Sequence, residues 1–196
     1  MAPEQYVNVY SCRLALPYIA GYGSLPNEYP ESDPRHGIVI DYGTLPGSSP
    51  PLNLGHTLVH ELGHYFGLLH PFQGGCANPG DDVSDTPAES GPAFGCMVGR
   101  DTCPEEGVDP VKNFMDYSDD TCTDSFSPLQ SARMQTLTRV YRPALGDPIR
   151  TASVPTTSAI GLFVLALILM AMGRCHLQRE LGRQHRAPVS SGRNQF

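Results

Sequence analysis

The sequence predicts an α+β domain followed by a membrane-spanning segment. Gln5–Ser11 and Gly37–Tyr42 are expected to be short strands, and the second alternates apolar residues at its start. Leu54–Phe66 and Ser127–Val140 have apolar residues at helical spacing. Residues 159–173 carry no polar side chain at all. With 20 glycines and 19 prolines among 196 residues, much of the remaining chain is expected to be loop.

The charge is unevenly distributed along the chain. Residues 1–150 carry 8 Lys/Arg and 19 Asp/Glu, whereas residues 151–196 carry 5 and 1, for the total net charge of −7. An acidic body of this kind argues against a nucleic-acid partner.

The apolar run at residues 159–173 is predicted to be a single transmembrane helix. It spans about 22 Å at 1.5 Å per residue, which is short for a hydrocarbon core of about 30 Å. A buried core helix is the alternative, but the run is apolar on all faces. The sequence thus divides into a large domain at 1–147, a Pro/Ser/Thr-containing stalk at 148–158, the span, and a basic tail at 174–196.

The arginines of the tail predict a cytoplasmic C-terminus, with the large domain outside the cell. The first ten residues, MAPEQYVNVY, have neither the basic nor the apolar region of a signal peptide. We therefore expect either that the C-terminal span targets the chain to the membrane or that the N-terminal part is truncated. A secreted protein is the alternative location.

Four cysteines lie within 47 residues of loop-like chain, which indicates two disulfides and an oxidising compartment. They are Cys76, Cys96, Cys103 and Cys122. Four cysteines allow three pairings, and their spacing does not select one. Cys12 and Cys175 are left over, with no role assigned.

The segment HELGHYFGLLH, His60–His70, predicts a metal site on a helix that begins after Asn53 as its N-cap. His60 and His64 are four residues apart and lie on one face, about 6 Å apart along the helix axis. Glu61 is rotated away from the two imidazoles, where it can accept a proton from water.

Gly67 explains how His70 can join the other two histidines. In a continuous helix His70 would point away from His60, whereas glycine permits a sharp turn that ends the helix. Three histidines leave one position open, as in catalytic zinc sites. A solvated helix with scattered histidines is the alternative, but the full HExxHxxGxxH pattern is far more specific than HExxH.

That pattern resembles the metzincin zinc proteases, which also have a methionine turn, here in NFMDYSDD. The stretches NLGHTLVHELGHYFGLLHPFQGGC, GDDVSDTPAE and NFMDYSDDTCTDSFSPLQSARM are similar to the pappalysin family, and within it to fungal extracellular metalloproteases. The resemblance covers about Gly37–Met134. It implies a zincin/metzincin-like domain with a short N-terminal mixed sheet, an active-site helix and a disulfide-stapled irregular C-terminal subdomain.

The resemblance also implies the roles of individual residues. Glu61 would be the general base, Met115 the hydrophobic floor of the site, and Tyr117 a hydrogen-bond donor to the reacting oxygen. A nearby edge strand would hold the substrate by β-augmentation. The implied zinc ligands are His60, His64 and His70. The implied disulfides are Cys76–Cys103 and Cys96–Cys122.

Three aspartates in Gly80–Pro87 make calcium a second candidate cofactor, since relatives bind calcium in this region and hard cations prefer oxygen ligands. They are Asp81, Asp82 and Asp85. The alternative is a solvated acidic turn.

These observations predict a zinc-dependent endopeptidase that acts on extracellular proteins or peptides. A non-catalytic zinc-binding surface module is the alternative, because the family's long backing helix has no counterpart before His60. Without that helix, part of the apolar face formed by Leu58, Leu62, Tyr65 and Phe66 is expected to be exposed. The sequence does not reveal the substrate or the oligomeric state.

Overall fold

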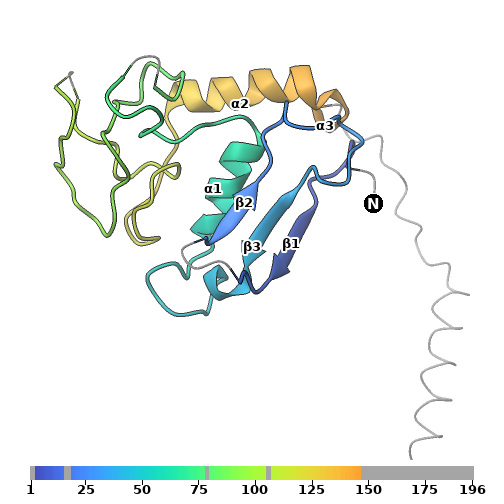
Figure 1. Cartoon of the computed structure of the whole chain (residues 1–196), viewed down its shortest axis with the longest axis horizontal. Coiled ribbons are helices and arrows are strands. Elements are labelled where there is room, and N and C mark those ends of the chain that lie inside the picture. Colours follow the sequence, from blue (N-terminus) through green and yellow to red (C-terminus); the bar gives the residue numbers. More distant parts are fainter. Residues whose placement is uncertain (1–2, 16–18, 78–79, 105–106, 147–196) are drawn as a thin grey trace, which may run out of the picture. The chain divides into compact units, whose positions relative to one another are not determined.

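The computed structural model describes residues 3–15, 19–77, 80–104 and 107–146, which belong to one compact unit (Figure 1). A small sheet comes first in the chain, followed by the helix α1, a long irregular segment and two further helices. The elements are β1 (Val9–Cys12), β2 (Gly21–Gly23), β3 (Ile38–Asp41), the 3-10 helix η1 (Tyr42–Thr44), α1 (His56–Tyr65), α2 (Pro128–Tyr141) and α3 (Pro143–Gly146).

The sheet is mixed, as predicted, with β3 in the middle. β1 pairs with β3 in parallel, with Val9 opposite Ile38, and β2 pairs with β3 antiparallel, with Gly23 opposite Ile38. β1 was expected at Gln5–Ser11 but begins at Val9. β2 was not predicted, because two of its three residues are glycines and the segment Gly-Tyr-Gly cannot show the alternation of side chains typical of a strand.

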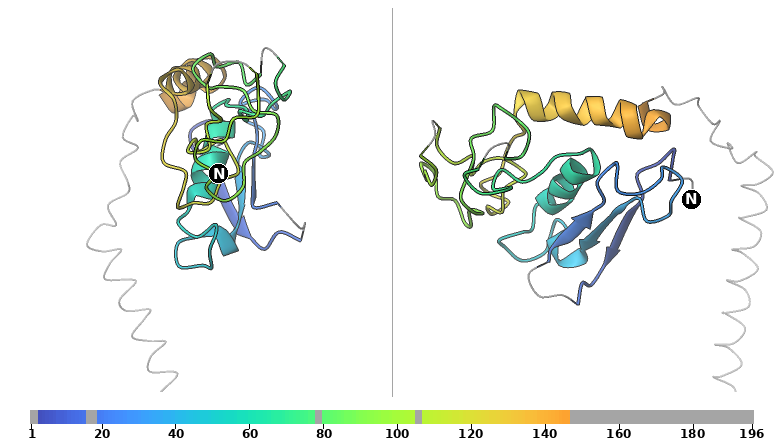
Figure 2. Two further views of the ribbon diagram at one scale, coloured as in Figure 1. Left: turned by 90° about the vertical axis from the view of Figure 1, so that its left-hand side faces the viewer. Right: turned by 45° about the horizontal axis from the view of Figure 1, so that its top comes forward.

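The main hydrophobic core lies between α1 and one face of the sheet (Figure 2). Ile38 and Ile40 of β3 and Tyr65 of α1 are fully buried or nearly so. Other side chains pack against this core but remain partly exposed, among them Leu58, Leu62, Phe66 and Leu145. Part of the apolar face of α1 is thus accessible to water.

The start of α1 corrects one expectation from the sequence. The helix begins at His56 rather than Leu54, and the residue at its N-cap is Gly55, with φ of 88°. Asn53 does not cap the helix, because its side-chain amide donates to the Ser48 carbonyl instead. The left-handed backbone of Gly55 sets the direction in which the helix leaves the preceding loop.

α2 begins with a complete capping box. The Ser127 hydroxyl accepts from the Gln130 backbone N–H, the Gln130 side chain accepts from the Ser127 N–H, and Pro128 occupies the first turn. The helix ends at the fully buried Arg142, whose guanidinium lies 4.9 Å from the centre of the Tyr65 ring. A cation over an aromatic face is a favourable contact. This contact joins the C-terminal end of α2 to Tyr65, the last residue of α1.

The segment between α1 and α2 gathers at one end of the unit (Figures 1 and 2). Its described residues form no helix or strand and contain one isolated β-bridge, between Asn113 and Ser125. A small cluster of Ala93, Val111 and Cys122 forms its apolar centre. Disulfides join Cys76 to Cys103 and Cys96 to Cys122.

In the part of the chain that the structure describes, no helix has the length and apolar character needed to cross a membrane. The predicted stalk, transmembrane helix and basic tail, residues 148–196, lie outside the described residues, as does Cys175. Cys12 lies at the end of β1, exposed and with a free thiol.

Candidate metal centre

The N-terminus of α1 is held by a carboxylate from far along the chain. Gly55 offers no side-chain cap. Instead, Asp120 Oδ2 accepts hydrogen bonds from the backbone N–H groups of Leu54, at 2.6 Å, and His56, at 3.4 Å. A negative charge at a helix N-terminus is electrostatically favourable. This contact fixes α1, with two of the histidines, against the end of the irregular segment.

The turn after α1 requires glycine at Gly67. Its φ is 98°, its N–H bonds to the His64 carbonyl at 2.8 Å, and the Leu68 N–H bonds to the Gly63 carbonyl at 2.9 Å. A Cβ atom at Gly67 would also lie 2.3 Å from Leu137 Cδ1. Backbone conformation and lack of space therefore both exclude a side chain here, and the chain reverses direction toward His70.

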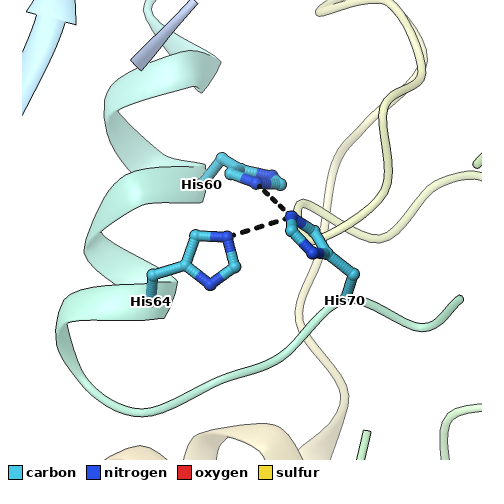
Figure 3. A group of neighbouring side chains, drawn as sticks. All are labelled: His60, His64 and His70. Atoms are coloured by element: carbon cyan, nitrogen blue, oxygen red, sulfur yellow. Dashed lines mark hydrogen bonds between the residues drawn. The ribbon is translucent and has the colours of Figure 1, made fainter. Parts of the chain in front are cut away.

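The structure brings the three motif histidines together (Figure 3). His70 Nε2 lies 3.1 Å from His60 Nε2 and 3.0 Å from His64 Nε2. Two nitrogens that each bind a tetrahedral zinc ion at 2.0–2.1 Å are about 3.3 Å apart. Within the described residues, this triad is the only group of three or more His, Cys, Asp or Glu side chains whose donor atoms converge closely enough to hold a metal ion.

The second nitrogen of two of these rings is already bonded to the protein. His60 Nδ1 lies 2.7 Å from the Phe114 carbonyl, and His64 Nδ1 lies 2.9 Å from the Leu68 carbonyl. A carbonyl only accepts, so in each ring Nδ1 carries the hydrogen and Nε2 presents its lone pair. Metal-ligating histidines are usually oriented in this way.

The three imidazoles are also favoured in their neutral form. Burial, together with the neighbouring His64, lowers the pKa of His60 to about 4, and burial lowers the pKa of His64. Burial and the two other histidines lower the pKa of His70 to about 3. Because a metal ion binds only the unprotonated imidazole nitrogen, the donor set suits zinc at neutral pH.

Glu61 is buried beside the histidines, against the edge strand β2. A Cβ atom at Gly21 would lie 2.8 Å from Glu61 Oε1, and one at Gly23 would lie 2.4 Å from the Glu61 carbonyl oxygen. The two glycines of β2 thus allow the strand to approach α1 closely. Burial raises the pKa of Glu61 to about 7, although a bond to the Gly23 backbone opposes the shift. A carboxyl with such a pKa can exchange protons near neutral pH.

Met115 lies fully buried against α1. A Cβ atom at Gly63, between the two helical histidines, would lie 2.2 Å from Met115 Sδ. The Met115 N–H donates to Asn113 Oδ1, and the Asn113 and Gln130 side chains bond to each other at 2.7 and 3.2 Å. The methionine turn is therefore anchored to the first turn of α2.

Tyr117 lies near the triad on the far side of the methionine turn. Its ring centre is 5.6 Å from that of His60 and 5.1 Å from that of His70. Phe72 stacks on His70 at 4.5 Å and lies 5.0 Å from Tyr117. Burial, followed by the charges of Glu61 and Asp116, raises the pKa of Tyr117, so its hydroxyl keeps its proton at neutral pH.

The three aspartates considered for calcium do not converge among the described residues. Asp81 accepts from the Val83 N–H and the Thr86 hydroxyl, and Asp82 lies 3.5 Å from Arg133. Asp85 accepts from the Ser127 hydroxyl and the Leu129 N–H at the start of α2. Each carboxylate therefore has a separate protein partner: Asp81 bonds within its own loop, whereas Asp82 and Asp85 connect that loop to α2.

Several residues that shape the site were not found by sequence reasoning. They are Gly21, Gly23, Asn113, Asp116, Asp120 and Gln130. Each acts through a contact with a residue distant in the sequence, which no local pattern encodes. Asn113 and Asp116 flank Met115 in the NFMDYSDD stretch, and this proximity was the one available signal.

The fold and the histidine triad above a buried methionine are those of a metzincin-like peptidase. A peptidase M43 family model, described as pregnancy-associated plasma protein-A, matches residues 1–139. The chain belongs to this family, the pappalysins, as the sequence motifs predicted.

Curated relatives and solved structures agree with this assignment. An extracellular metalloprotease of Colletotrichum graminicola and one of Podospora anserina are each 56% identical over 90 residues, which cover 45% of this chain and 32% and 31% of those proteins. The chain thus spans about a third of the length of the curated relatives it matches. Mature mirolysin of Tannerella forsythia, solved with a cleaved peptide, superposes with a TM-score of 0.65 and 29% identity, over 73% of this chain and 57% of mirolysin.

Proposed function

We propose that the protein is a zinc-dependent endopeptidase with Glu61 as its general base. The observation that carries the proposal is the arrangement of the triad. Three Nε2 atoms meet at one point, and two of the rings are fixed by carbonyl acceptors on Nδ1. Glu61 follows His60 directly in the chain and is buried beside them. Such a site has the ligands for the metal and a separate group for the proton.

The chemistry divides between the metal and the side chains. His60, His64 and His70 would hold the zinc ion, which would act as a Lewis acid that makes water more acidic and polarises a peptide carbonyl. Glu61 accepts the proton of the attacking water and passes it to the leaving amine. The Tyr117 hydroxyl, which keeps its proton at neutral pH, donates a hydrogen bond to the oxygen that gains negative charge.

The edge strand β2 supports a peptide as the substrate. Among the described residues it pairs with β3 on one side only, and it lies directly against Glu61. An extended peptide that pairs with the free edge of β2 would pass in front of the general base. β3 is central in the sheet, so the predicted strand at Gly37–Tyr42 is not the one that offers its edge. Mirolysin, which is similar to this chain, was solved with a cleaved peptide.

We place the peptidase domain outside the cell. The relatives are named extracellular metalloproteases, and two disulfides are typical of an oxidising compartment. Secretion accounts for these observations. Membrane anchoring by residues 159–173, with a stalk at 148–158, stays a prediction, and resistance of the full chain to carbonate extraction would test it.

The proposal is tested by zinc content and peptide hydrolysis, measured on the full chain and on Glu61→Gln. We expect one zinc per chain in both proteins. The variant should lose about 10²- to 10⁴-fold in kcat, because the ligands remain while the base is absent. If the wild-type chain bound zinc but cleaved no peptide, it would be the non-catalytic zinc-binding module instead. If Glu61→Gln kept most of its kcat, the role of Glu61 would be wrong.

A further inference from the structure

Three aromatic rings form a continuous row that leads away from the triad. Phe72 stacks on His70, Tyr117 lies 5.0 Å from Phe72, and Phe94 lies 6.3 Å from Tyr117. We call Phe72, Tyr117 and Phe94 the aromatic rim. Tyr117 is 43% exposed and Phe94 is 63% exposed, so the outer part of the rim faces water.

The chain on both sides of Phe94 is firmly held. The Ala93 N–H donates to Asp116 Oδ1 at 3.0 Å, and Ala93 is fully buried. The Gly95 carbonyl accepts from the Asp119 N–H at 2.9 Å, and the next residue, Cys96, is disulfide-bonded. Phe94 is therefore displayed by a backbone that is fixed immediately before and after it.

The same contacts set Phe94 and Tyr117 relative to each other. Asp116 Oδ1 accepts from both the Ala93 N–H and the Tyr117 N–H, the latter at 2.7 Å. One buried carboxylate thus holds the backbone of Ala93, which precedes Phe94, and the backbone of Tyr117 itself. A large apolar ring whose backbone is already fixed adds no backbone ordering cost when it binds a partner.

The length of the rim matches a peptide that reaches the metal site. The ring centres of His70 and Tyr117 are 5.1 Å apart, and those of Tyr117 and Phe94 are 6.3 Å apart. An extended peptide advances about 3.3 Å per residue. The rim therefore reaches at most about three residues from a peptide bond held at the triad.

We propose that Phe94, together with the rest of the aromatic rim, binds a bulky apolar side chain of the peptide substrate within about three residues of the cleaved bond. This inference rests on the proposed peptidase function and adds a substrate class to it. Met97 and Val98, which follow Phe94 in the same loop, are also exposed, at 46% and 69%. Phe94 is thus a specificity-determining residue that contributes no atom to the bond-breaking step.

Peptide binding by the zinc-loaded Glu61→Gln chain tests this without relying on turnover. The protein has no tryptophan, so the emission of a terminal tryptophan on a short peptide reports binding directly. The peptides carry leucine in place of alanine at each position in turn. With Phe94 present, the peptide with leucine at one position should bind at least about tenfold more tightly than the peptide with alanine there. Burying a large apolar side chain is worth roughly 1.5–3 kcal/mol.

Phe94→Ala should reduce that ratio to about threefold or less. The affinity for the alanine peptide and the zinc content should stay unchanged. Phe94→Leu, which keeps an apolar side chain, should retain most of the ratio. Tyr42→Ala is the matched control, because Tyr42 is 49% exposed and has no ring contact among the described residues. An unchanged ratio in Phe94→Ala overturns the inference. The inference is also overturned if the wild-type chain self-associates and Phe94→Ala abolishes that self-association while the peptide preference stays unchanged.

Cleavage by the wild-type chain separates the two proposals. Cleavage without a preference for leucine at any position overturns the aromatic rim as a substrate site and leaves the peptidase in place. A Phe94-dependent preference in binding, without cleavage by the wild-type chain, overturns the peptidase proposal and leaves Phe94 as part of a peptide-binding surface.

Discussion

The sheet with α1 and the segment 71–127 differ in what keeps the chain in place. In the first region, backbone hydrogen bonds pair the strands, and apolar side chains such as Ile38, Ile40 and Tyr65 pack between sheet and helix. In the second, two disulfides surround an apolar cluster of only three residues. Each region supplies part of the candidate metal centre, which therefore depends on both kinds of stabilisation.

Buried carboxylates do for the irregular segment what strand pairing does for the sheet. Asp81, Asp109, Asp116 and Asp120 are all buried, and each accepts a hydrogen bond from a backbone N–H group. Bonds of this kind satisfy backbone donors where no helix or strand does so. This segment is therefore specified by individual side chains, whereas the sheet is specified by a repeating pattern of strand pairing.

The largest expected effect concerns the histidines of α1. His64→Ala should lower zinc affinity by more than about 100-fold, because loss of a direct ligand exceeds the 10- to 100-fold typical of outer-shell changes. His56 is the matched control, since it lies on the same helix but bonds to Thr123 at 2.9 Å. Competition with a zinc chelator measures both. Equal losses in His56→Ala and His64→Ala would mean that α1 as a whole, rather than the triad, binds the ion.

The disulfides should distinguish the two regions most clearly in stability. Replacing Cys76 and Cys103 by serine should lower the free energy of unfolding by about 3.5 kcal/mol in the chain-entropy model, for a separation of 27 residues. Hydrogen exchange should rise first in the segment 71–127 and later in β3 and α1. The control is Cys12→Ser, which removes a free exposed thiol. Uniformly faster exchange would show that the two regions unfold as one.

A smaller effect is expected where the two regions touch, at Gly63. Gly63→Ala should destabilise the protein, because overpacking against Met115 costs about 1–3 kcal/mol and helix propensity restores at most about 1 kcal/mol. At Gly91, an added Cβ meets no atom within 4 Å, so Gly91→Ala is the matched control. Urea unfolding of both variants measures the difference. A Gly63→Ala protein as stable as Gly91→Ala would show that Met115 moves freely.

A pH dependence is also expected for the irregular segment. Burial, with the charge of Asp116, raises the pKa of Glu89 to about 7, although Arg100 lies 2.6 Å from it and 2.8 Å from Asp109. The folded state thus binds this proton more tightly than the unfolded chain. The stability from Glu89 is complete below pH 4.5 and is lost as the pH rises to about 7.

Glu89→Gln removes that titration and serves as the reference for the wild-type protein. Between pH 4.5 and 7, the free energy of unfolding of the wild-type protein should fall relative to that of Glu89→Gln, and above pH 7 the difference should stay constant. Urea unfolding at matched pH values measures both proteins. A difference that does not change with pH would mean that the pKa of Glu89 is the same in the folded and unfolded chains.

The parts of the molecule that sequence predicted are those with a local signal. The helix carrying His60 and His64 was predicted to within two residues at its start, and the turn at Gly67 followed from a single glycine. The mixed sheet and the family were confirmed. β2 was missed, since its two glycines are required by the Glu61 side chain and backbone rather than by strand propensity.

The carboxylate contacts were equally invisible. Asp120 binds the Leu54 N–H across 66 residues, and Asp85 binds the Leu129 N–H across 44 residues. An aspartate in a loop has the same appearance in a sequence whether it is solvated or buried against a distant backbone group. The fold alone determines which helix N-terminus each of these aspartates contacts.

The histidine triad also bears on how quickly the site can form. His60 and His70 are only ten residues apart in the chain, whereas the disulfides join cysteines separated by 26 and 27 residues. A ten-residue loop closes in about 10–100 ns, whereas disulfides form over seconds to hours. The three ligands can thus meet repeatedly before any covalent link exists.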